Sequence, residues 1–179
     1  MAASSAATTA SAAEPPLKFY QPRTKRNLEG NLFSWFAVVP PVPPSSAMID
    51  AAVAKLKEGD PKIVKIERAD TSPPEDVEGF HVTILARIRE KDEKHQAYLK
   101  RTFELASFTA ADVRPKIDPN TGQHKFVILQ KGGMLYVIFE YEESTALHKW
   151  RETFAKVHCE EDFQVHGAHV TAVYATLQK

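Results

Sequence analysis

The chain contains the stretch His81-Val82-Thr83-Ile84 in its first half and repeats it as His169-Val170-Thr171-Ala172 in its second half. Each copy lies in an apolar, β-branched run of the kind that favours a β-strand. Because a strand turns successive side chains to opposite faces, each His shares a face with the Thr two residues later, while the intervening Val faces the core. Each strand is therefore predicted to present an imidazole beside a hydroxyl.

The segments before the two motifs follow one plan. Residues 32–39 are aromatic and β-branched, and they precede a helix that Ser45 or Ser46 caps and that ends before Gly59. Residues 134–141 form a second apolar strand, followed by a helix that Ser144 caps. The apolar face of that second helix is predicted from residues at helical spacing: Leu147, Trp150, Phe154 and Val157. We predict an α+β chain that repeats one plan twice.

The middle of the chain is predicted to add a helix and two reversals. The charged segment 89–101 is predicted to be helical. Residues 113–117 and 125–130 are predicted to pair as a hairpin around the turn sequence at 118–122. Gly132-Gly133 makes a second reversal into the next strand.

This arrangement resembles the two-histidine (2H) phosphoesterase superfamily, which includes the RNA 2′,5′-ligase-like proteins and the plant and fungal cyclic phosphodiesterases. The resemblance runs from about Leu32 to Leu177 and rests on the two His-apolar-Thr-apolar strands, on their spacing, and on the strand and helix before each motif. It implies a bilobal fold of two antiparallel β lobes with flanking helices. Both His-Thr pairs are then expected to face one central cleft.

The chemistry expected of these residue types is phosphodiester hydrolysis without a metal or other cofactor. A base must deprotonate water, and an acid on the opposite side must protonate the leaving oxygen; His81 and His169 can each do either near neutral pH. Thr83 and Thr171 can hydrogen-bond the non-bridging phosphate oxygens. The rough symmetry of the two pairs leaves open which His is the acid.

Two further residues are weaker candidates for substrate binding. Plant cyclic phosphodiesterases resemble this chain in having an aromatic residue at the position of Tyr174. In perfect alternation Tyr174 faces away from His169, so it reaches a substrate only if the strand bulges or ends there. Arg87 is expected to share a face with His81 and Thr83 and to meet phosphate, although a rim arginine is more often only solvated.

The N-terminal part is expected to lie outside the domain. Residues 1–16, rich in Ala, Ser and Thr, are predicted to be a disordered tail, 17–31 a linker, and 32–179 the 2H phosphoesterase-like domain. Many superfamily members add a strand after the second motif. Either this lobe is shorter, or the segment around residues 17–23 takes the place of that strand.

Composition narrows the class of protein. The chain has 179 residues, 43% hydrophobic, with 23 basic residues against 23 acidic ones and a sequence pI near 7.1, which disfavours a general nucleic-acid coat protein or a double-stranded DNA binder. No apolar run is long enough to span a bilayer. With the single Cys159, these features favour a cytoplasmic monomer, although a nuclear location or weak organelle targeting by the tail stays open.

Alternatives remain open at this stage. The leading hypothesis is a hydrolase of 2′,3′-cyclic phosphates, 2′,5′-linked or other small cyclic nucleotides or RNA ends, with degradation of cyclic dinucleotides as a variant. The competing hypothesis is a catalytically idle module of the same fold that binds RNA ends or a protein partner. A zinc site is disfavoured because its candidate ligands are poorly spaced: His158, Cys159, His166 and His169. Core packing is favoured over base stacking for four aromatic residues: Trp35, Phe36, Tyr136 and Phe139.

Overall fold

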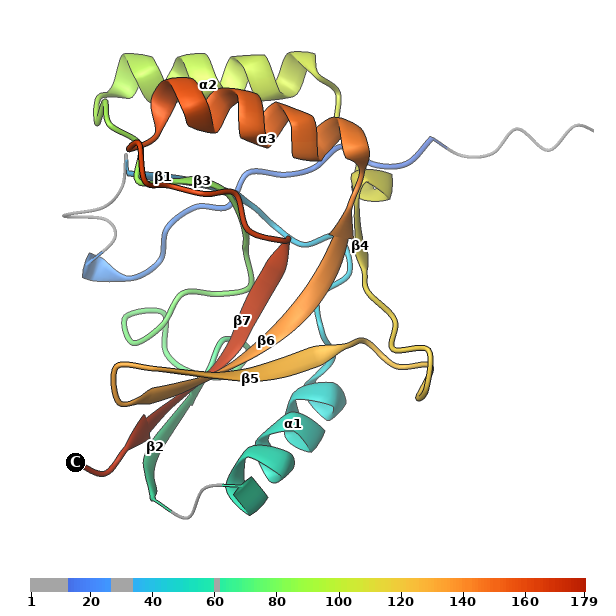
Figure 1. Cartoon of the computed structure of the whole chain (residues 1–179), viewed down its shortest axis with the longest axis vertical. Coiled ribbons are helices and arrows are strands. Elements are labelled where there is room, and N and C mark those ends of the chain that lie inside the picture. The colour runs from blue at the N-terminus through green and yellow to red at the C-terminus, as the bar shows by residue number, and fades with distance from the viewer. Residues whose placement is uncertain (1–12, 27–33, 60–61) are drawn as a thin grey trace, which may run out of the picture.

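The computed structural model describes residues 13–26, 34–59 and 62–179. These residues form two antiparallel sheets and three α-helices (Figure 1), which confirms the α+β class. In the described part of the chain, no helix has the length and apolarity that a membrane span requires. The helices are α1 (Ser46–Gly59), α2 (Glu93–Leu105) and α3 (Thr145–His158). The strands are β1 (Trp35–Val38), β2 (Ile63–Arg68), β3 (Val82–Ala86), β4 (Val113–Pro115), β5 (Phe126–Lys131), β6 (Met134–Glu143) and β7 (His169–Leu177).

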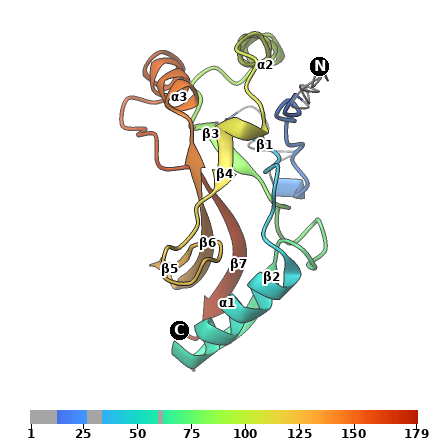
Figure 2. The ribbon, with the colours of Figure 1, turned by 90° about the vertical axis from the view of Figure 1, so that its right-hand side faces the viewer.

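The first motif lies in the smaller sheet. Strand β3 pairs antiparallel with β1, from Val38 opposite Val82 to Trp35 opposite Ala86. Helices α2 and α3 lie side by side across this pair in both views (Figures 1 and 2). Buried aromatic and aliphatic side chains, including Phe36 of β1, join the strands and helices into one core.

An N-terminal segment also packs against β1. Residues 17–31 were expected to form a linker, yet the structure places residues 17–20 beside this strand. The main chain of Tyr20 donates to the carbonyl of Ala37 (2.9 Å), and that of Val39 donates to the carbonyl of Lys18 (2.8 Å). Leu17 is buried, and the Phe19 ring contacts that of Phe36.

The burial of these apolar side chains explains why the segment docks. It joins the sheet of the first motif, so it does not take the place of a strand beside the second. The part of the expected tail and linker at 1–12 and 27–31 lies outside the described residues.

The second motif lies in the larger sheet. Its strand order is β2-β7-β6-β4, and β5 also pairs with β6. Helix α1 packs beside β2 and β7 (Figure 2) and buries Ile49, Ala52 and Leu56, so the predicted helix is confirmed. The predicted reversal at Gly132-Gly133 is confirmed as well, because both glycines have a positive φ between β5 and β6.

The hairpin predicted from 113–117 and 125–130 is only partly correct. The turn at 118–122 closes through a bridge between Ile117 and His124. Beyond that bridge, β4 and β5 do not pair with each other, and each pairs with β6 instead. The ten-residue β6 is long enough to hold both strands in succession.

Helix α3 begins at its predicted cap, where the Ser144 hydroxyl accepts from the main-chain N–H of Leu147 (3.1 Å). Its buried line differs from the predicted face. Val157 is 59% exposed, whereas Arg151 is only 3% exposed. Three residues of the predicted face, Leu147, Trp150 and Phe154, do pack on the core, and the buried line extends from Leu147 through Arg151 to Ala155 in place of Val157.

Arg151 links the two halves of the chain. Its guanidinium donates to the carbonyls of Ile84 (3.0 Å) and Thr83 (3.2 Å) in β3, and to the carboxylate of Glu143 (2.7 Å) at the end of β6. The burial of this ion pair is tolerated because its polar groups are satisfied by specific partners. A side chain of the second half therefore holds the main chain of the first motif.

We expect Arg151→Met to destabilise the protein by about 3–5 kcal/mol, because the carbonyls of Thr83 and Ile84 would lose a donor and the Glu143 carboxylate would keep only His148 as a partner. Urea unfolding followed by circular dichroism measures this free energy. The matched control is Arg114→Met, whose side chain is 63% exposed and whose loss should cost less than about 1 kcal/mol. Equal costs for the two variants would contradict the role given to Arg151.

Candidate active site

Both motifs begin their strands in the same way. His81 immediately precedes β3, and His169 is the first residue of β7. Val82 and Val170 are buried, while the His and Thr residues of each motif are only half-buried. The predicted alternation, with the Val side chain in the core and the His and Thr side chains on the other face, is therefore present at the start of both strands.

Each imidazole is held by the carbonyl of the glycine two residues before it. The Nδ1 of His81 lies 2.9 Å from the carbonyl oxygen of Gly79, and the Nδ1 of His169 lies 2.9 Å from that of Gly167. A carbonyl only accepts hydrogen bonds, so Nδ1 carries the proton and the neutral ring keeps its lone pair on Nε2. That nitrogen is the one available for proton transfer.

These glycines were missed in the sequence, although a signal for them was present. The repeat extends two residues further back than the motif, as Gly-x-His-Val-Thr at both 79–83 and 167–171. The two glycines differ in their surroundings, because a Cβ at Gly167 would meet nothing within 4 Å. A Cβ on Gly79 would collide with the Arg23 guanidinium.

Both strands bulge at the same point of the motif. In β3, Leu85 pairs with Phe36 and Thr83 with Ala37, which leaves Ile84 without a partner. In β7, Val173 pairs with Val137 and Thr171 with Ile138, which leaves Ala172 without one. The two residues after each Thr are therefore both buried, and the alternation of faces shifts by one residue.

The bulge in β7 is the irregularity that Tyr174 requires in order to lie on the same face as His169. The shift returns Tyr174 to the face that carries His169 and Thr171, and Thr171 lies near enough to the phenol to lower its pKa slightly. Burial, with smaller contributions from Glu78 and Tyr136, raises the pKa of Tyr174 to about 12. The phenol is therefore protonated at neutral pH and can donate a hydrogen bond.

The bulge in β3 changes the placement expected for Arg87. Leu85 turns into the core, and Arg87 follows the strand with a positive φ of 53°. Its guanidinium is paired with Glu160 (Nε, 2.8 Å) and Asp162 (Nη1, 2.9 Å). Arg87 stands at the rim of the site, but its charge is already shared by two carboxylates, which makes it a weaker phosphate ligand than expected.

These residues surround an open pocket of about 490 Å³. His81, Thr83 and Tyr174 line it, with Trp35 and Lys91 also on its wall. Thr171 adjoins it through Tyr174. His169 is not on its wall but lies close enough for its charge to lower the pKa of His81. The structure therefore brings the first motif and Tyr174 of β7 to one pocket, and His169 lies outside its wall.

The surroundings of His81 favour its neutral form. Burial is the main cause that lowers the pKa of His81, and the His169 charge adds to it, while the Gly79 carbonyl and the Glu78 carboxylate act in the opposite direction. The rings of Tyr20 and Trp35 cover the imidazole, with centroids at 4.9 and 5.3 Å.

The aromatic residues considered for base stacking divide into two groups. Phe36 and Phe139 are fully buried, as core packing predicts. Trp35 and Tyr136 are half-buried on the side of the site, where Trp35 lines the pocket and the Tyr136 ring meets that of Tyr174 edge-on at 5.7 Å. The Trp35 ring is therefore placed to contact a ligand in this pocket, whereas Tyr136 adjoins the pocket only through Tyr174.

The cysteine near the second motif is part of the buried core. Cys159 is buried at the end of α3, and burial raises the pKa of its thiol to about 11. A protonated thiol is a poor metal ligand. Within the ranges that the structure describes, no three His, Cys, Asp or Glu side chains are grouped to hold a metal ion.

The chain was also compared with protein-family models, with curated proteins and with solved structures, and none of the three comparisons found a match. The assignment of the site therefore rests on its geometry.

We expect His81 to titrate below its ordinary value of about 6.5, in ¹H–¹³C NMR spectra of the imidazoles. The His169→Ala variant should raise the pKa of His81, because a neighbouring positive charge is removed. His148 serves as an internal reference, since its hydrogen bond to Glu143 raises its pKa. A pKa of His81 at or above 6.5 in the wild type would contradict this description.

Proposed function

We propose that the protein is a metal-independent phosphodiesterase of the two-histidine type, with the bilobal arrangement of that superfamily. One observation carries the proposal. Two Gly-x-His-Val-Thr strands, far apart in the chain, share the same Nδ1-to-carbonyl hydrogen bond and the same bulge after Thr, and β7 contributes Tyr174 to the pocket that His81 and Thr83 line. A core histidine has no need for such a repeated arrangement, whereas acid–base chemistry on one phosphate needs two imidazoles of fixed tautomer.

In the proposed mechanism, the neutral Nε2 of His81 accepts a proton from the attacking water. Its surroundings, which lower the pKa of His81, suit the role of base. His169 then donates a proton to the departing ribose oxygen.

The hydroxyl groups would hold the phosphate between the two imidazoles. Thr83 and Thr171 donate to the non-bridging oxygens, and the protonated phenol of Tyr174 supplies a further donor beside Thr171. Trp35, on the wall of the pocket, presents its ring to the rest of the substrate. These features favour a small nucleotide or an RNA end with a 2′,3′-cyclic phosphate or a 2′,5′ linkage.

We expect His81→Ala and His169→Ala each to remove most of the turnover of a 2′,3′-cyclic nucleotide. The double variant should be little worse than either single variant, because an acid and a base act as one unit. Thr83→Val and Thr171→Val should each cost about 1–3 kcal/mol of transition-state stabilisation. Steady-state kcat/KM measures all five variants, with circular dichroism as a check of folding. Additive losses in the double His variant would count against the mechanism.

We expect the rate to follow a bell-shaped curve between pH 5 and 9 and to survive a chelator, because two imidazoles carry the protons. Cys159→Ser is the control for the cysteine near the second motif and should retain the wild-type profile. Loss of activity on chelation that added zinc restores would contradict the proposal. Binding of the nucleotide by calorimetry with no turnover at any pH would instead support the idle binding module.

A further inference from the structure

The carboxylate beside the first motif ties the N-terminal segment to the site. Glu78, only 7% exposed, accepts from the Tyr20 hydroxyl (2.7 Å), from the Thr24 hydroxyl (2.7 Å), and from the main-chain N–H groups of Arg23 and Thr24 (2.8 Å each). A buried carboxylate needs several donors to remain charged, and this segment supplies them. Residues 20–24 are therefore anchored to Glu78, which precedes His81 by three residues.

Tyr20 makes a second hydrogen bond that leads to the imidazole. Its phenol oxygen accepts from the main-chain N–H of Gly79 (2.8 Å) while its hydrogen goes to Glu78. Burial, together with the Glu78 carboxylate, raises the pKa of Tyr20 above its ordinary value, so the phenol keeps this hydrogen. Gly79 in turn provides the carbonyl that receives Nδ1–H of His81.

Gly79 requires such a restraint. Glycine has more accessible backbone conformations than any other residue, so a carbonyl carried by glycine is held only as well as its neighbours hold it. Tyr20 holds the N–H of Gly79 and covers the imidazole with its ring at a centroid distance of 4.9 Å. The hydroxyl and the ring of one side chain thus act on the tautomer and on the orientation of His81.

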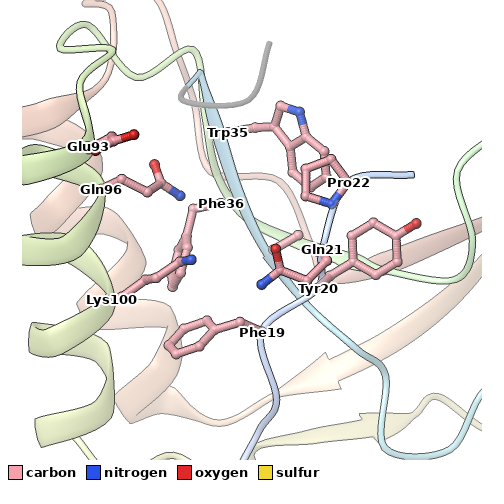
Figure 3. A pocket seen from close by; sticks show the side chains of 10 residues that line it. Phe19, Tyr20, Gln21, Pro22, Trp35, Phe36, Glu93, Gln96 and Lys100 are labelled. Atoms are coloured by element: carbon pink, nitrogen blue, oxygen red, sulfur yellow. The ribbon is translucent and has the colours of Figure 1, made fainter. Parts of the chain in front are cut away.

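The close view of the neighbouring pocket shows how the side chain of Tyr20 is directed (Figure 3). Glu93, Gln96 and Lys100 enter that pocket from α2, whereas the Tyr20 ring points away from α2. The Tyr20 ring therefore lies on the side of the N-terminal segment that faces away from α2. Its ring instead packs with those of Trp35 (6.0 Å) and His81.

We infer that Tyr20 is a positioning residue, which holds His81 in the Nδ1–H tautomer with Nε2 free for proton transfer. The second motif provides a contrast, because no aromatic ring contacts His169 among the residues described. The kinetic consequence rests on the proposed function, since it requires His81 to transfer a proton. The tautomer itself is independent of any activity.

The test is Tyr20→Phe in the full chain, which removes the hydroxyl and keeps the ring. Long-range ¹H–¹⁵N spectra at pH 8 report which nitrogen of each neutral imidazole carries the proton. We expect the wild-type His81 to be in the Nδ1–H form and the variant to show a mixture, with His169 unchanged as an internal control. The kcat for a 2′,3′-cyclic nucleotide should fall about tenfold, the loss of one hydrogen bond, with KM within about twofold.

Two control variants separate positioning from stability. Tyr98→Phe removes an exposed phenol on α2, far from Glu78 in the chain, and should leave both the tautomer and kcat unchanged. Thr24→Val removes another hydroxyl donor of Glu78 and should lower the melting temperature while His81 keeps its tautomer. The same tautomer mixture in Thr24→Val would overturn the inference, because loosening of the segment would then be the cause.

The remaining outcomes are also distinct. An unchanged His81 tautomer in Tyr20→Phe would overturn the inference, whatever the kinetics. A wild-type protein with no turnover of any cyclic or 2′,5′-linked nucleotide would overturn the proposed function alone. The tautomer spectra would still decide whether Tyr20 positions His81.

Discussion

The first motif depends on the hydrogen bonds that the buried guanidinium of Arg151 donates to the main chain of β3. A bulge removes carbonyls from the regular ladder of a strand, and a buried carbonyl without a partner costs about 1–3 kcal/mol. Arg151 reaches from α3 to the carbonyls of Thr83 and Ile84, and Glu143 balances its charge. The bulge that separates the face of His81 and Thr83 from the core is therefore stabilised by the other half of the chain.

Local rules predicted much of this protein from its sequence. The serine cap of α3, the apolar face of α1 and the glycine reversal before β6 each depend on residues within a few positions of one another. The shared face of His81 and Thr83 likewise follows from the two-residue period of a strand.

Features that depend on distant partners were not predicted. Charged residues are rarely buried, so no sequence pattern favoured Arg151 over Val157 on the inner face of α3. The short segment at 17–24 contains Leu17, Phe19 and Tyr20, but its docking becomes evident only when β1 and Glu78 are seen to bind it. The bulges required knowledge of the partner strands, because register decides which residue is left unpaired.

The two bulges also differ in how easily mutation can remove them. The unpaired residue of β7, Ala172, has its carbonyl bound by the main-chain N–H of Ala69 (2.9 Å), a group that every amino acid except proline possesses. The corresponding carbonyl of β3, that of Ile84, is bound instead by the side chain of Arg151, which a single substitution removes. Substitution of Arg151, about seventy positions away in the sequence, would therefore disturb the bulge beside His81. The bulge beside His169 depends on a main-chain N–H, so nearly any residue is tolerated at position 69.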